Sequence, residues 1–214
     1  MDRFLRQEIR VPCDSSLLAG VLVVPEKSAR LVIFAHGGKS GRLSPRNQYI
    51  AKELNKNNCA TLLVDLLTVM EDETEENQFN IALLTKRLLL IIKQIQTMEE
   101  TKRLSIGIFG TNTGAAAALD AASLSGMNVR AVVSGSGRSD LAREDLSSIP
   151  ASALFIVGGR DEETMALNRA TIPLMTKAES ATLKVIPGAT NLFDEKDALE
   201  ATAKEATRWF QLYL

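Results

Sequence analysis

The sequence is short of the residues that metal and disulfide chemistry require. Its 214 residues include one histidine, His36, and two cysteines, Cys13 and Cys59, which stand far apart and form no C-x-x-C pair. One histidine excludes a zinc site built on two, and two cysteines are too few for a tetrahedral thiolate cage. We therefore expect no metal site, and reduced thiols of a cytoplasmic protein rather than a disulfide framework.

The chain also lacks an excess of charge and a long apolar segment. Lys and Arg number 25 against 26 Asp and Glu, a formal net charge of -1, so there is no general attraction to nucleic acid or to anionic membranes. The longest apolar run in the helical stretches, at 88–92, is far shorter than the ~18 residues of a membrane-spanning helix. Residues 1–12 alternate charged and apolar side chains, unlike a signal peptide. We expect a cytoplasmic protein with no membrane or nucleic-acid partner.

Short apolar segments alternate with longer helical patterns along the chain. The period-two segments 4–11 and 17–24 flank a turn and predict an antiparallel hairpin, whereas continuous apolar segments are typical of strands buried in a parallel sheet. Further strands are expected at 31–35, 61–64, 106–109, 129–133, 153–157 and 181–186, and helices at about 46–56, 79–95, 114–124, 162–177 and 197–214. The acid-rich residues 71–77 are expected to form a solvated loop. The order predicts one α/β domain over 1–214, with a mostly parallel eight-stranded sheet flanked by helices.

The sharpest motif is G-T-N-T-G at 110–114, between an expected strand and an alanine-rich helix. A strand-to-helix turn of pattern G-x-nucleophile-x-G is a nucleophile elbow. Glycine suits both ends because a Cβ there would clash in such a strained, crowded turn. An active enzyme has Ser, Cys or Asp at the centre, and this chain has Asn112.

Two further turns follow in the order expected of a catalytic triad. The sequence G-G-R-D-E at 158–162 follows a strand and places Asp161 where the triad acid belongs. The sequence P-G-A-T-N-L-F at 187–193 follows the next strand and places Asn191 where the triad histidine belongs. The chain therefore has an acid at its expected position and carboxamides at the other two.

Residues 36–47 read H-G-G-K-S-G-R-L-S-P-R-N. This segment resembles the H-G-x-G-x-S-R-x-S-P-R-N of small bacterial members of the dienelactone hydrolase-like branch of the α/β hydrolases. The similarity continues through the elbow, the acid turn and the P-G-A-T turn, so it covers nearly the whole chain. It implies an α/β-hydrolase fold without a large cap domain, and relatives that hydrolyse small esters or lactones. Those relatives have Ser at position 112 and His at 191, whereas Asp161 matches.

The two asparagines remove the proton transfer on which acyl transfer depends. A carboxamide nitrogen shares its lone pair with the carbonyl, so Asn112 is not a nucleophile. Asn191 cannot take up a proton near neutral pH. Losing a triad serine or histidine costs about 10⁶ in turnover. We therefore predict a pseudoenzyme with a degenerate triad. Deamidation of Asn112 would supply an aspartate nucleophile, but the following residue, Thr113 rather than glycine, predicts that it is slow.

A binding site is expected to persist. The main-chain amides of Thr113 and of Gly37 or Gly38 would form an oxyanion hole, and the start of the elbow helix favours an anion. The side chains of Thr111 and Thr113 should point away from the substrate. Positive charge near the mouth could come from Lys39, Arg42 and Arg46, which could equally belong to a solvated loop with one structural arginine.

Three functions are open at this point. The chain keeps a pocket for a small molecule, including an anionic one, and works by binding or as a partner subunit. Alternatively, it hydrolyses small esters or lactones through a non-standard site with His36 and Asp161, although a packed and hydrogen-bonded imidazole is the more ordinary role for His36. Thirdly, it is a ligand-free interaction domain. No cofactor is expected, since the glycine spacings match neither a dinucleotide fingerprint nor a P-loop. The sequence leaves open a homo-oligomer.

Overall fold

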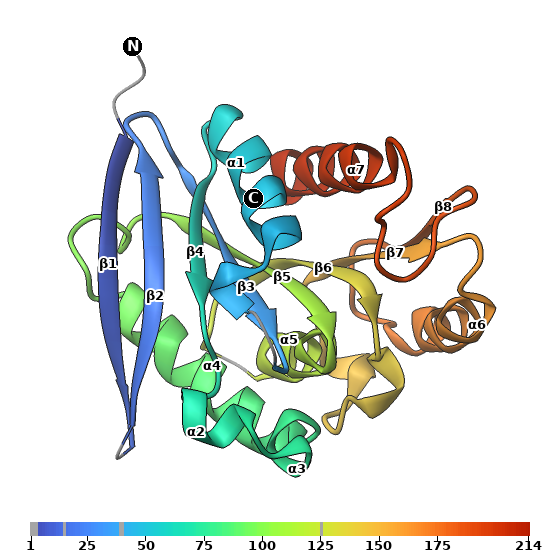
Figure 1. The fold of residues 1–214 in the computed structure, drawn as a ribbon, viewed down its shortest axis with the longest axis horizontal. Helices are drawn as coiled ribbons and strands as arrows, with labels where there is room; N and C mark the ends of the chain where they lie inside the picture. The colour runs from blue at the N-terminus through green and yellow to red at the C-terminus, as the bar shows by residue number, and fades with distance from the viewer. Residues whose placement is uncertain (1–3, 15, 39–40, 125) are drawn as a thin grey trace.

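The computed structural model describes residues 4–14, 16–38, 41–124 and 126–214. One eight-stranded sheet runs through the molecule, with helices on both faces (Figure 1). The strands are β1 (Phe4–Cys13), β2 (Ser16–Pro25), β3 (Arg30–His36), β4 (Ala60–Val64), β5 (Ser105–Asn112), β6 (Val129–Gly137), β7 (Ser152–Gly158) and β8 (Ala181–Ile186). The α-helices are α1 (Pro45–Lys56), α2 (Val69–Asp72), α3 (Glu75–Gln78), α4 (Ile81–Ile95), α5 (Thr113–Ser123), α6 (Glu162–Thr171) and α7 (Ala198–Tyr213).

The strand order confirms the expected α/β architecture. The sheet runs β1-β2-β4-β3-β5-β6-β7-β8. β1 pairs antiparallel with β2, and β2 pairs antiparallel with β4. Every other neighbouring pair is parallel. The carboxyl ends of β3, β5, β6, β7 and β8 therefore meet at one edge, which is where parallel sheets place their sites.

Apolar side chains from both faces of the sheet form two buried clusters. Leu54 of α1 and Phe210 of α7 belong to one cluster, and Leu88 of α4 and Leu119 of α5 belong to the other. In Figure 1, α1 and α7 accordingly lie above the sheet, and α4 and α5 below it. Among the described helices, none has the length and apolarity needed to cross a membrane.

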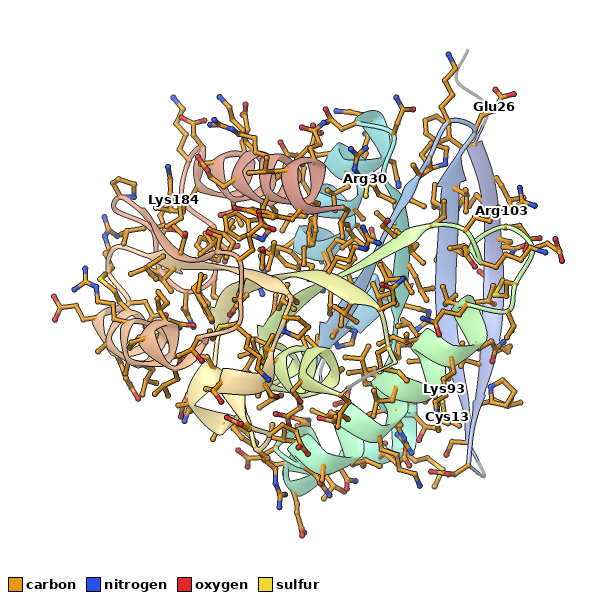
Figure 2. All side chains as sticks on the ribbon, turned by 180° about the vertical axis from the view of Figure 1, so that it is seen from behind. Cys13, Glu26, Arg30, Lys93, Arg103 and Lys184 are labelled. Carbon is orange, nitrogen blue, oxygen red and sulfur yellow. The ribbon has the colours of Figure 1, made fainter. Side chains whose placement is uncertain are left out.

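The polar surface and the buried thiols fit this layering. Seen from behind, the charged side chains of Glu26, Arg103 and Lys184 project outward from the ends and edges of the sheet (Figure 2). Cys13 and Cys59 are free and buried. Burial raises the pKa of Cys59 to about 12, with a smaller opposing effect from Arg30, so Cys59 stays a protonated thiol at neutral pH.

Two expected elements are wrong. The helix expected over 162–177 ends at Thr171 and passes into the 3₁₀ turn Ile172–Leu174, because Pro173 cannot donate the hydrogen bond that continues an α-helix. The acid-rich segment 71–77 is not a solvated loop, because it contains the end of α2 and most of α3.

Glu71 anchors the acid-rich segment to the core. Thr68 and Glu71 form a capping box at the start of α2. The Glu71 carboxylate also pairs with both guanidinium Nη atoms of Arg87 on α4, and Arg87 donates to the Leu66 carbonyl at 2.8 Å. The Arg87 side chain is only 4% exposed. A run of acids looks alike in a solvated loop and in a capped turn, and its buried partner lies 16 residues away, so sequence pattern alone could not separate the two.

The Glu71–Arg87 pair predicts a stability change with pH. The Arg87 guanidinium, with help from Thr68, lowers the pKa of Glu71 from 4.5 to about 2. The stabilisation from this pair should be complete above about pH 4.5 and be lost as the pH falls toward 2. Glu71→Gln should lower the free energy of unfolding at neutral pH by about 1.5–3 kcal/mol and flatten this acid dependence, as measured by urea unfolding. The exposed Glu76→Gln is the matched control. Equal losses in the two variants would contradict the anchoring role.

Candidate functional site

The elbow at the end of β5 has the strained backbone expected of it. Asn112 is the last residue of β5, and its φ of 49° and ψ of -127° lie in a region that non-glycine residues rarely occupy. A Cβ on Gly110 would lie 2.6 Å from the Ala115 Cα, and one on Gly114 would overlap the main chain at the end of β3. The predicted reason for both glycines is confirmed, and Asn112 is held at the apex of the turn.

Main-chain hydrogen bonds join the turn at 158–162, which carries Asp161, to the turn at 187–193, which carries Asn191. The N–H of Gly159 donates to the Ile186 carbonyl at 2.8 Å, and that of Arg160 donates to the Ala189 carbonyl at 2.9 Å. Asp161 caps α6, its Oδ1 accepting from the Thr164 N–H at 3.2 Å. The Asp161 Oδ2 is buried and has no hydrogen-bond partner among the described residues. Asn191 is exposed on the neighbouring turn.

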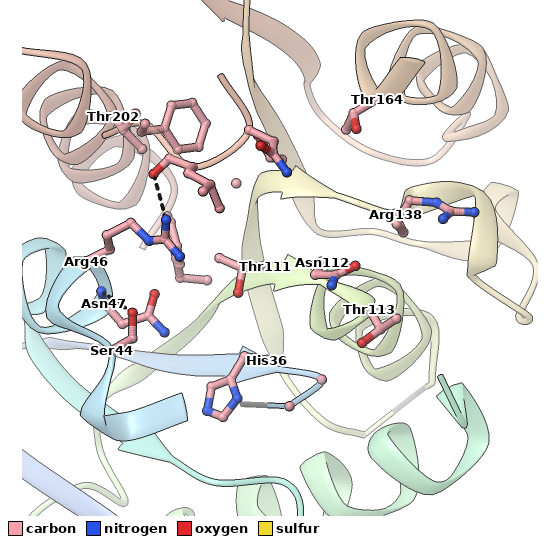
Figure 3. Close-up of a pocket in the computed structure, with 18 of the residues that line it drawn as sticks. His36, Ser44, Arg46, Asn47, Thr111, Asn112, Thr113, Arg138, Thr164 and Thr202 are labelled. Atoms are coloured by element: carbon pink, nitrogen blue, oxygen red, sulfur yellow. Dashed lines mark hydrogen bonds between the residues drawn. The ribbon is translucent and has the colours of Figure 1, made fainter. Parts of the chain in front are cut away.

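A cavity of about 540 Å³ collects most of the predicted site residues at the carboxyl edge of the sheet (Figure 3). Its lining includes Asn112, Asp161 and Asn191, together with the predicted oxyanion residues Gly37, Gly38 and Thr113, and also His36 and Arg46. Three turns that are distant in the sequence therefore face one space. Apolar side chains, including Ile50, Phe109 and Leu199, complete its walls.

Thr111 and Thr113 both belong to the residues that line this cavity (Figure 3). The Thr113 hydroxyl donates to the Gln78 carbonyl at 2.8 Å. It also fills the space that a side chain on Gly37 would need. The bond ties the start of α5 to the end of α3, and Gln78 and Phe79 there form part of one wall of the site.

His36 is packed and hydrogen-bonded. Its Nε2 lies 3.1 Å from the Val64 carbonyl oxygen, and a carbonyl only accepts, so Nε2 carries the proton. The ring lies where a side chain on Gly41 would otherwise sit. Burial lowers the pKa of His36, although the Asp65 carboxylate, 3.9 Å from Nε2, acts to raise it. The Nδ1 atom is buried without a hydrogen-bond partner among the described residues.

The three basic residues expected near the mouth of the cavity differ in where they lie. The Arg42 guanidinium pairs with the Asp65 carboxylate, and the main-chain N–H of Arg42 donates to the same carboxylate at 3.0 Å. Arg42 is not among the described residues that line the cavity, which favours the structural role that the sequence left open for one arginine. Arg46 lines the cavity and donates to the Leu192 carbonyl at 3.2 Å. Lys39 lies outside the described residues.

Two residues at the end of β6 were not among the predicted site residues. Ser136 and Arg138 line the cavity at and just beyond the end of β6. Ser136 has a φ of 43°, and its Oγ is buried without a hydrogen-bond partner among the described residues. Arg138 makes two bonds of 2.7 and 2.8 Å to Asp140 and lowers the pKa of that carboxyl group. The polar run S-G-S-G-R that directly follows an apolar strand was the available signal.

Comparison with solved structures gives two kinds of likeness. A dienelactone hydrolase from Anabaena variabilis is 40% identical, with a TM-score of 0.93 and a match covering 99% of each chain. The enzyme Est1E from Butyrivibrio proteoclasticus is 17% identical, with a TM-score of 0.77 and a match covering 96% of this chain and 97% of Est1E. The second likeness extends to the fold alone.

Comparison with curated proteins finds relatives that are longer than this chain. Two strains of Mycobacterium tuberculosis each have a protein named "Putative phosphoribosyl transferase" that is 46% identical over 205 residues. The match covers 95% of this chain and 46% of each relative, so the chain spans about half the length of the curated relatives it matches. No family model matches the chain.

The bond between Thr113 and Gln78 predicts a selective loss of stability. Thr113→Val keeps the shape of the side chain and removes the hydroxyl, leaving the Gln78 carbonyl without its donor. The free energy of unfolding should fall by about 1 kcal/mol, measured by urea denaturation. Thr113→Ser keeps the hydroxyl and should lose less. A larger loss in the serine variant would show that the methyl group, rather than the hydrogen bond, is what matters there.

Proposed function

Because the chain belongs to the dienelactone hydrolase-like family of α/β hydrolases, we propose that it is a catalytically impaired member that binds a small polar molecule in the cavity at Asn112. The observation that carries the proposal is the carboxamide at the apex of an intact elbow. The turn keeps its strained geometry, and the side chain it presents has no nucleophilic atom.

Among the described residues, no other group near Asn112 makes up for the missing base. Asn191 at the base position cannot take up a proton near neutral pH. His36 is the only histidine in the sequence. Its Nε2 carries the proton bound to the Val64 carbonyl, and Nδ1, the nitrogen that would accept a proton, is buried. Desolvation disfavours the charged imidazolium that a general base must become. These observations weigh against the alternative of a hydrolase that uses His36 and Asp161.

Polar atoms without partners support a ligand in the cavity. Burying a polar atom without a hydrogen bond costs about 1–3 kcal/mol, and both Asp161 Oδ2 and Ser136 Oγ are in that position among the described residues. The Thr113 N–H, in the first turn of α5, has no acceptor within the helix. A molecule with a hydroxyl or amine donor and a carbonyl or carboxylate acceptor would satisfy these atoms together.

The charges around the cavity favour this polar ligand over a highly charged one. Arg46 and Arg138 line it together with Asp161 and Glu163, so the formal charges of the described lining residues cancel. Arg138 is paired with Asp140, and Arg46 lies 3.4 Å from Asp194. A carboxylate would therefore be held chiefly by main-chain N–H groups and by the start of α5.

Restoring the triad should restore hydrolysis if the scaffold is intact. Asn112→Ser with Asn191→His should hydrolyse p-nitrophenyl acetate measurably above the wild type, because the pair again provides a nucleophile and a base. Each single variant should stay at the wild-type level, and so should Asn112→Ala. A wild-type protein with an ordinary turnover of about 1–10³ s⁻¹ would contradict the proposed impairment. If that turnover survived in Asn112→Ala, the reaction would also lie elsewhere.

Ligand binding can be tested without knowing the natural ligand. Benzoate and benzamide are small probes of matched shape that differ in charge, and a probe bound in the cavity should raise the melting temperature by mass action. Thr164→Trp should abolish the shift by filling the cavity from α6, whereas Ala166→Trp, on the exposed side of the same helix, should keep it. A shift that is absent, or equal in both variants, would contradict the binding proposal and favour a ligand-free interaction domain.

A further inference from the structure

The backbone of Asn112 brings the next nitrogen into line with its own side chain. With ψ at -127°, and with Cβ offset by about 120° from the main-chain nitrogen around the tetrahedral Cα, the Thr113 nitrogen lies nearly eclipsed with the Asn112 Cβ. Four of the five atoms of a cyclic imide are then already close to one plane. Rotation about the Cα–Cβ bond is the step that remains to bring Cγ to the nitrogen.

We propose that Asn112 is a site of spontaneous deamidation through this ring. The Thr113 main-chain nitrogen loses its proton and attacks the Asn112 Cγ. A new N–C bond forms, and the side-chain nitrogen leaves as ammonia. Water then opens the imide at either carbonyl, giving aspartate or isoaspartate. The net reaction consumes one water and releases one ammonia, and it requires no oxidant, reductant or cofactor.

Two features of the elbow favour this attack. The Thr113 N–H is the first of α5, so no carbonyl within the helix accepts from it, and the positive end of the helix dipole stabilises the deprotonated nitrogen. The Asn112 side chain is exposed and makes no capping hydrogen bond. The Thr113 N–H therefore has no acceptor within its helix, and the Asn112 side chain makes no capping bond that would compete with the reaction. The β-branched Thr113 hinders the approach sterically, which is why the sequence alone predicts a slow reaction.

Asn80 provides a natural comparison within the same chain. Like Asn112, it is exposed, stands immediately before a helix and is followed by a β-branched residue, here Ile81. Its ψ is 80°, which places the Ile81 nitrogen on the far side of the Cα–C bond from Cβ. Its side chain also accepts from the Leu83 N–H at 3.1 Å. The two sites share a sequence type and differ in the geometry that the reaction needs.

The products would change the site in two ways. Aspartate puts a carboxylate at the apex of the elbow, in the cavity that Asp161 also lines, and the formal net charge of the chain falls by one. Isoaspartate adds a carbon to the main chain at the junction of β5 and α5, where Gly110 and Gly114 leave no room for a shift. Conversion at this one residue would therefore alter both the charge and the shape of the cavity.

Peptide mass mapping of the intact protein tests the proposal directly. After incubation of the native chain at mildly alkaline pH, the peptide containing Asn112 should gain the mass of deamidation about tenfold faster than the peptide containing Asn80, because the folded backbone already holds the strained geometry that the ring needs. In concentrated urea both peptides should convert at similar rates. Isoaspartate at position 112 would identify the imide route.

The variant Asn112→Gln is the chemical control, since glutamine would need a six-membered ring and should show no fast conversion. Equal native rates at Asn112 and Asn80, or a rate at Asn112 that rises on unfolding, would overturn the proposal. The readout is a mass, so the result is independent of ester hydrolysis and of ligand binding. A failure here would leave the proposed function standing, and a failure of that function would leave the modification site standing.

Discussion

The close approach between the start of α5 and the end of β3 is the constraint on which the site depends. Any side chain on Gly114 would overlap the main chain of Ala35 and His36, so the helix can begin only where a bare Cα meets the neighbouring strand. That contact fixes the height of the elbow above the sheet and forces the strained backbone at Asn112. The geometry is therefore a property of the packing and does not depend on which side chain stands at the apex.

A second set of contacts supports the wall of the cavity that lies at the end of α3. The Arg87 guanidinium, almost fully buried, ties Glu71 to the core, and the Gln78 carbonyl at the end of α3 receives the Thr113 hydroxyl. Gln78 also donates to the Asp72 carbonyl at 2.7 Å, which links the two short helices. Neither helix is long enough to be stable alone, so these side-chain bonds and the core beneath them keep the wall in place.

Sequence pattern was sufficient for the sheet and for the three turns. The alternation of apolar segments with helical patterns predicted the eight strands of a mostly parallel sheet, and G-T-N-T-G predicted the elbow at Asn112, because both signals are local. The partners of Glu71 and of Arg42 were not predictable in this way. Each is an ion pair between residues 16 or more apart, and the pairing follows from packing. For Ser136 the polar run S-G-S-G-R was a signal, but residue type alone does not show that its φ is positive or that its hydroxyl is buried.

The Thr113 hydroxyl donates its single proton to the Gln78 carbonyl, so it cannot donate to a ligand at the same time. The Thr113 peptide N–H has no acceptor within α5, and a peptide group is the same whatever residue carries it. In the proposed binding role, an acceptor atom of the ligand would therefore be bound by the main chain and not by a side chain. Exchanging serine for asparagine at the apex would therefore remove a nucleophile and leave this peptide N–H in place.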